Sequence, residues 1–170
     1  MIGRGLVVLL MLAITTAHAE DESARDRIEQ NPLVGTWNLV RYAETPEGGE
    51  PAQLFGESPI GQFIFTGDGH MSVHIMRNPP NPEDAVVDPD PDACVPGWYC
   101  AYFGTYTVDA GGRYWVTHVD GGNIPTYIGT DQKRIFTIDS DRLVISEKYI
   151  SEGVPVSAER VLIRSHGTRK

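Results

Sequence analysis

The feature that most constrains the fold of this chain is a succession of short extended segments separated by turns. The segments are rich in β-branched and aromatic residues, and their connections, such as 66–69 and 109–112, carry the Gly and Asp residues that tolerate positive φ angles. There are about eight of them, and an antiparallel sheet of about eight strands can close on itself and lose its edges. No long amphipathic helix interrupts them, so we predict an all-β fold, an antiparallel up-and-down β-barrel. The predicted strands are 33–42, 61–66, 70–76, 102–108, 114–119, 132–138, 142–150 and 156–163.

The side-chain pattern also predicts how two of these strands pair. Apolar residues alternate with polar ones in the second and third segments, and both apolar sets face the interior only if Phe65 lies opposite Met71. Residues 114–119 alternate less clearly, with Trp115 on one face and His118 on the other. The pattern leaves open which of those two faces is interior.

The N-terminus has the organisation of a signal peptide over residues 1–19. Arg4 supplies a positive charge, residues 6–14 form a short apolar run, and residues 17–19 read Ala-His-Ala, a small-x-small cleavage site. We expect a mature chain beginning at Glu20 that is periplasmic or secreted, with no membrane attachment after cleavage. An uncleaved anchor is the alternative.

Composition indicates one folded domain, with 41% hydrophobic and 22% charged residues. The formal charge of -9 repels nucleic-acid phosphates and anionic membrane surfaces, so we expect no nucleic-acid partner. Residues 20–31 are charged and form at most a short helical lead-in before Pro32.

The segment 77–101 departs from the strand pattern because it is rich in Pro and in acidic residues. A loop of this length in a compact domain is often a lid or a binding loop, and we expect a lid over one mouth of the barrel. Export would place Cys94 and Cys100 in an oxidising compartment, which predicts a disulfide worth about 2 kcal/mol by the chain-entropy estimate. The acids of 88–92 resemble a calcium loop, but Ala93 stands where such a loop needs Gly, and we predict no metal site.

Residues 33–37, Leu-Val-Gly-Thr-Trp, resemble the Gly-x-Trp motif that opens the first strand of lipocalins. In that family the Trp closes one end of the barrel beneath a basic side chain from a late strand, which implies Arg164 or Arg160 as the partner of Trp37. Further segments resemble the bacterial lipocalin-like domain family, the lipocalin-5 group, over nearly all of 32–163. The resemblance implies a barrel domain over 32–165 with an internal cavity and no known reaction. The segments are 61–65, 68–77, 101–106, 117–119, 127–132 and 141–143.

Residues of two kinds are candidates for lining that cavity. Arg134 is costly to bury without an anion, so an inward Arg134 would pair with Asp131, Glu159 or a ligand carboxylate. Otherwise it is a solvated strand residue, and the apolar candidates are equally consistent with an ordinary filled core. The apolar and aromatic candidates are Trp37, Phe63, Phe65, Met71, Val73 and Tyr106, and the polar candidates are His118, Tyr127 and Arg134.

These observations favour an exported protein that binds a small hydrophobic or amphipathic molecule, mostly apolar and bearing a carboxylate or carbonyl group. A small isomerase, cyclase or lyase using His118 with Tyr127 or an Arg is the first alternative. A structural module with a filled barrel is the second. Nucleotide-binding, esterase-type and zincin motifs are absent from the sequence, and we predict no cofactor.

Overall fold

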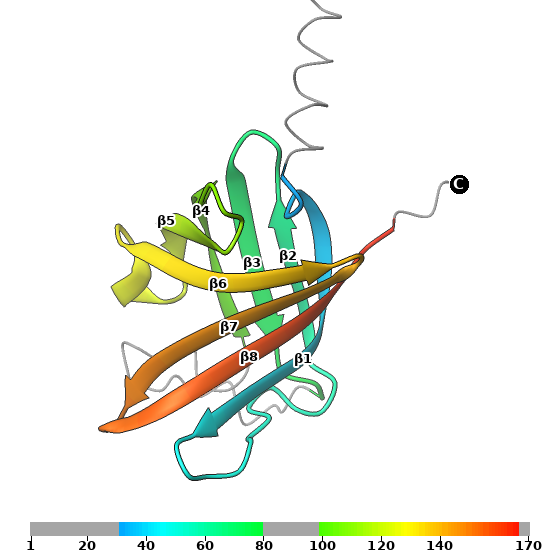
Figure 1. The fold of residues 1–170 in the computed structure, drawn as a ribbon. Helices are drawn as coiled ribbons and strands as arrows, with labels where there is room; N and C mark the ends of the chain where they lie inside the picture. The colour runs from blue at the N-terminus through cyan, green and yellow to red at the C-terminus, as the bar shows by residue number, and fades with distance from the viewer. Residues whose placement is uncertain (1–30, 80–98, 167–170) are drawn as a thin grey trace, which may run out of the picture. The chain divides into compact units, whose positions relative to one another are not determined.

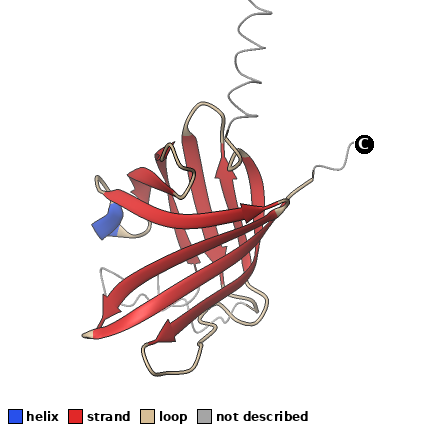
Figure 2. Cartoon of the chain, viewed as in Figure 1, coloured by secondary structure: helices blue, strands red, loops and turns tan. Residues whose placement is uncertain are grey.

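A computed structural model describes residues 31–79 and 99–166, and within them eight antiparallel strands form one closed barrel (Figure 1). Each strand pairs with its neighbours in sequence, and β1 pairs with β8 to complete the cylinder. Figure 2 shows that strands make up nearly all of the drawn secondary structure, beside the short 3-10 helix η3 (Pro125–Tyr127). The predicted all-β, up-and-down fold is confirmed. The strands are β1 (Gly35–Pro46), β2 (Ile60–Phe65), β3 (His70–Met76), β4 (Tyr99–Val108), β5 (Tyr114–Gly122), β6 (Asp131–Asp139), β7 (Arg142–Ser151) and β8 (Val154–Arg164).

Several sequence predictions fall outside the described residues. They are the signal peptide at 1–19, nearly all of the lead-in at 20–31, and Cys94 with most of the loop 77–101. The lid and the Cys94–Cys100 disulfide therefore stay predictions. No helix in the described part of the chain has the length and apolar character needed to cross a membrane.

A short unit ends at Val34, and the barrel unit begins at Gly35. In the described part of the first unit, the chain turns so that the Val34 N–H donates to the Asn31 carbonyl at 3.1 Å.

The register between β2 and β3 is as predicted, with Phe65 opposite Met71. The connecting turn has Gly69 at a φ of 89°, a conformation that glycine adopts without steric penalty, and the Gly69 N–H donates to the Thr66 carbonyl. The structure also decides the open question in β5. Trp115 is fully buried on the inner face, so the alternate residues, including His118, point outward.

One half of the barrel interior is filled by aromatic side chains. The Arg164 guanidinium lies 4.0 Å from the centroid of the buried Trp37 ring, which confirms Arg164 as its basic partner. Trp115 forms an edge contact with Phe65 at 5.3 Å between ring centroids and a tilted contact with Phe136 at 5.4 Å. Its indole N–H donates to Thr117, so this buried donor is satisfied. We call this region the Trp37 half.

A β-bulge in β1 changes which side chains face inward. Leu39 pairs with Leu162, but the register then shifts, and Tyr42 pairs with Arg160. Because one extra residue is inserted, Tyr42 faces the interior where strict alternation from Trp37 would turn it outward. The bulge therefore brings a tyrosine into the half of the barrel remote from Trp37.

The contact between Arg164 and Trp37 generates the first prediction. Replacing Arg164→Gln removes a partly buried cation–π contact and an ion pair with Asp141, whose closest atoms are 3.4 Å apart. We expect the free energy of unfolding to fall by about 1–2 kcal/mol in denaturant titrations. The matched control is Arg142→Gln, since Arg142 is exposed on the neighbouring strand. Equal stability of the two variants would contradict the stabilising role.

Candidate functional site

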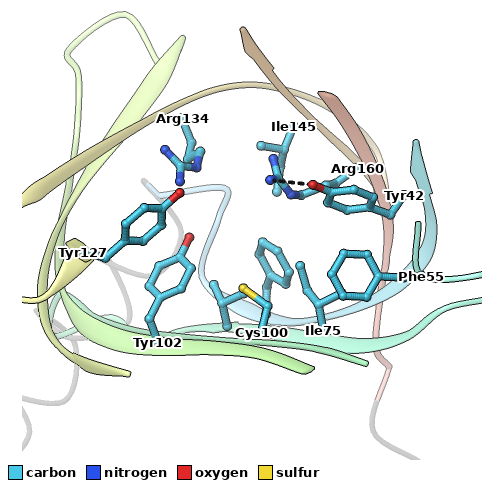
Figure 3. Close-up of a pocket in the computed structure, with 11 residues that line it drawn as sticks. Tyr42, Phe55, Ile75, Cys100, Tyr102, Tyr127, Arg134, Ile145 and Arg160 are labelled. Carbon is cyan, nitrogen blue, oxygen red and sulfur yellow. Dashed lines mark hydrogen bonds between the residues drawn. The ribbon is translucent and has the colours of Figure 1, made fainter. Parts of the chain in front are cut away.

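A cavity occupies the half of the barrel remote from Trp37. It is partly open to solvent, and the space between its side chains is about 390 Å³ when the open part is counted. Seven of the barrel strands and two connections contribute to its wall (Figure 3). The described residues that line it are Tyr42, Phe55, Phe63, Val73, Ile75, Cys100, Tyr102, Tyr127, Arg134, Ile145 and Arg160.

Most of the wall is apolar and buried. Phe63 and Val73 are paired neighbours on the inner face of β2 and β3, and Ile75 follows on the same face of β3. The β1–β2 connection brings Phe55 against Tyr42, with 4.8 Å between ring centroids. In Figure 3, Ile75 and Phe55 lie across the cavity from Arg134. The cavity is therefore amphipathic.

The polar wall is built on three consecutive strands. Arg134 of β6 and Arg160 of β8 both contact Glu147 of β7, with N–O distances of 3.1 and 3.0 Å to its two carboxylate oxygens. Only 5% of the surface of Arg134 is exposed, and its Nη1 also donates to the Lys133 carbonyl at 2.9 Å. Buried charges require such pairing, and one carboxylate here serves two guanidinium groups.

Tyrosine hydroxyls of β1 and β7 extend this cluster. Arg160 donates to the Tyr42 hydroxyl at 3.4 Å, and Tyr42 in turn donates to Glu44. Burial, and then hydrogen bonding to Glu44, raise the pKa of Tyr149 above its usual value. Burial also raises the pKa of Tyr42, and nearby Arg160 opposes this effect only in part. Both tyrosines are therefore neutral hydrogen-bond donors near pH 7.

The guanidinium of Arg160 remains charged in this setting. Burial by itself would lower its pKa, but the neighbouring Tyr42 and Glu147 raise the pKa above the ordinary arginine value. The cavity wall thus keeps a permanent cation beside a neutral hydroxyl.

Two further tyrosines, Tyr102 and Tyr127, point into the cavity near Arg134 (Figure 3). The rings of Tyr102 and Tyr127 make an edge contact at 5.8 Å between centroids, and the Arg134 guanidinium carbon lies 5.8 Å from the Tyr127 ring. Figure 3 shows both hydroxyls directed toward Arg134. Tyr102 is only 7% exposed, yet neither hydroxyl has a hydrogen-bond partner among the described residues. Burial raises the pKa of Tyr127, so its hydroxyl is also a neutral donor.

The structure places only some of the predicted residues at this cavity. Phe63, Val73, Tyr127 and Arg134 line it. The other apolar candidates are buried in the packed interior, away from the cavity wall, where they fill the barrel as core residues. They are Trp37, Phe65, Met71 and Tyr106.

His118 lies outside the barrel, which corrects its expected place in the cavity. Its side chain is 53% exposed, and its Nδ1 lies 2.9 Å from Asp131 on the neighbouring strand. The physical reason is the choice of face in β5, where the bulky Trp115 takes the interior. The catalytic alternative that used His118 in the cavity therefore lacks its histidine.

Arg134 points inward, but its partner differs from those considered. Asp131 pairs with His118, and Glu159 forms an exposed ion pair with Arg41 at 2.6 Å. Glu147 occupies the position beside Arg134 instead.

Sequence reasoning missed much of the polar wall. Strict alternation from the apolar residues of β7 does place Glu147 on the inner face, and this was the available signal. Tyr42 could not be placed inside from the sequence because the bulge in β1 shifts the alternation of its side chains. Phe55 lies in the β1–β2 connection, and no periodic pattern predicts the path of a connection. Among the described residues, no group of three or more His, Cys, Asp or Glu side chains is arranged to hold a metal ion.

Comparison with known families identifies a match over the whole barrel. A family model described as a lipocalin-like domain matches residues 34–164. The matched range spans every described strand and every cavity-lining residue. A search of curated proteins found no match to this chain.

The raised pKa of Tyr42 predicts how stability depends on pH. The folded state favours the neutral hydroxyl, so this contribution is complete below the unfolded tyrosine pKa of about 10 and is lost as pH rises further. We expect the free energy of unfolding to fall between about pH 10 and pH 12, and to fall less steeply in Tyr42→Phe. Urea titrations across this pH range measure both slopes. Identical slopes for the two proteins would show that Tyr42 does not contribute.

Proposed function

This chain belongs to the lipocalin-like domain family, and we propose that it binds one small, mostly apolar molecule inside its barrel. Folds of this kind generally bind small molecules, and the family gives no specific ligand. The observation that carries the proposal is the amphipathic cavity, in which buried apolar side chains face a group of convergent polar ones. Such cavities bind molecules with an apolar body and a polar group that fixes their orientation.

The apolar wall supports an apolar ligand body. Phe63, Val73 and Ile75 are each at most 3% exposed, and they form a continuous surface across β2 and β3. A ligand that covers this surface gains about 25 cal/mol for each Å² of apolar area removed from water. The cavity occupies only part of the interior of one eight-stranded barrel, so the ligand is a small molecule, not a long lipid chain.

The polar wall supports a ligand group that accepts hydrogen bonds. The hydroxyls of Tyr102 and Tyr127 and the guanidinium of Arg134 are all donors directed into one region. A buried donor without a partner costs about 1–3 kcal/mol, and a carbonyl or carboxylate group of the ligand would satisfy it. The same donors give no reason for a basic or purely hydrocarbon ligand.

The cavity also argues against a purely structural module. A barrel of about eight strands has room for its own side chains or for one small ligand, and the Trp37 half shows the filled arrangement. On the cavity side, the hydroxyls of Tyr102 and Tyr127 have no hydrogen-bond partner among the described residues, an arrangement that a filled structural core would avoid.

Filling the cavity should abolish binding. Ile75→Phe places a larger ring into the cavity, whereas Ile135→Phe makes the same change at a site that is 54% exposed on the outer face of β6. We expect native mass spectrometry of protein purified from its own host to show a bound small molecule with the wild type and with Ile135→Phe. Occupancy should fall by about tenfold in Ile75→Phe because no space remains for the ligand body. Equal occupancy in all three proteins, or no bound molecule in the wild type, would contradict the proposal.

We also propose that the protein works outside the cytoplasm, in the periplasm or as a secreted protein. The support is the signal-peptide organisation of residues 1–19. Expressed in its own host, the mature protein should begin at Glu20, as measured by its intact mass. The predicted bond between Cys94 and Cys100 should leave no thiol for alkylation until a reductant is added. A full-length cytoplasmic product would overturn this proposal.

A further inference from the structure

The charges that face the cavity do not balance. Its lining includes Arg134 and Arg160 and, among the described residues, no acidic side chain. Glu147 lies behind the two arginines and neutralises one of the two positive charges. The next acid, Glu44, is separated from Arg160 by the Tyr42 hydroxyl and is already held by Tyr42 and Tyr149. One positive charge therefore remains directed at the cavity.

Arg134 is the better placed of the two arginines to use that charge. Both of its hydrogen bonds leave from Nη1, one to the Lys133 carbonyl and one to Gln132 at 3.5 Å. Its closest contact with Glu147 also uses Nη1. A guanidinium has five N–H groups, so the donors on Nη2 and Nε have no hydrogen-bond partner among the described residues.

The donors of Tyr102 and Tyr127 converge on the same place. Both hydroxyls point toward Arg134, and Tyr102 comes from β4, whereas Tyr127 comes from η3 beyond β5. Segments far apart in the sequence thus direct three donors, one of them cationic, at one small volume. An anionic oxygen pair satisfies such a set better than a single neutral oxygen, because charge-assisted hydrogen bonds are about twice as strong as neutral ones.

We propose that the polar group of the ligand is a carboxylate, which binds between Arg134 and the hydroxyls of Tyr102 and Tyr127. This inference rests on the proposed function and adds the chemical class of the ligand, a small apolar monocarboxylate. Glu147 acts as a resident counter-ion that holds both arginines in place. It also limits the affinity for the ligand, because it neutralises one of the two charges that the carboxylate meets.

The first experiment compares three probes that share one apolar chain and differ in their polar group: octanoate, 1-octanol and octylamine. Isothermal titration calorimetry of the wild-type protein at pH 7 gives their dissociation constants. We expect octanoate to bind at least about tenfold more tightly than 1-octanol, because one charge-assisted bond is worth about that factor. Octylamine should bind more weakly than 1-octanol, since its ammonium group meets the remaining positive charge.

Variants then assign this preference to named residues. Arg134→Gln should weaken octanoate binding by about tenfold and leave 1-octanol within about twofold, because Arg160 still pairs with Glu147. Tyr102→Phe and Tyr127→Phe should each weaken octanoate binding by about threefold to tenfold. These two changes remove only hydroxyls that have no hydrogen-bond partner in the described part of the chain, so the fold should tolerate them. Arg41→Gln is the control, because Arg41 pairs with Glu159 on the outer surface.

Removing the charge of Glu147 should increase the affinity for octanoate, whereas the variants above should decrease it. Glu147→Gln keeps the shape of the side chain but removes its charge, so octanoate should bind about threefold to tenfold more tightly, with 1-octanol unchanged. If this variant fails to fold, the two Tyr→Phe variants and the probe comparison still decide the proposal.

Three outcomes would overturn the carboxylate proposal. Equal affinity for octanoate and 1-octanol, with a molecule still bound in the protein from its own host, would reject the carboxylate and leave the proposed function standing. Loss of all three probes together with an empty wild-type protein would reject both. Unchanged octanoate binding in Tyr102→Phe and Tyr127→Phe would place the binding elsewhere.

Discussion

Closure of the sheet is the constraint on which the rest of this structure depends. Once β1 pairs with β8, no described strand has an open edge, and every second side chain must share one enclosed interior. One half of that interior is packed with side chains, and the other half contains a cavity. Aromatic rings fill the Trp37 half, where Arg164 covers the indole from the last strand. Aromatic and aliphatic side chains together with two inward arginines border the other half, and they leave a cavity.

The cavity combines two requirements that usually oppose each other. Its apolar wall lowers the polarity around the side chains of the cavity, which makes unpaired charges costly. Its polar wall nevertheless holds two arginines, which are tolerated because Glu147 bridges them and Tyr42 accepts from Arg160. Pairing the two arginines with Glu147 and Tyr42 does not require the hydroxyls of Tyr102 and Tyr127. The additional hydroxyls of Tyr102 and Tyr127 are the reason that we propose a ligand group at this position, which would link the internal electrostatics to binding.

Individual residues show how far sequence reasoning reached. The opposition of Phe65 and Met71 followed from local alternation and a glycine turn, because both strands are adjacent in the chain. The place of Trp37 and its partner Arg164 followed from the resemblance to lipocalins. His118 was misplaced because both faces of its strand carry bulky residues, and only packing against β2 and β6 decides between them. Tyr42 was overlooked because a bulge reverses the alternation within β1.

The amino-acid sequence by itself determined the strands, their order and the turns that join them, since these depend on the period of two and on residues close together in the chain. Only the tertiary structure decided which half of the interior stays open, and that Arg134 meets Glu147 and not Asp131 or Glu159. The physical reason is that these outcomes depend on side chains from strands far apart in sequence. Their volumes and charges compete for the same enclosed space, and no local pattern records that competition.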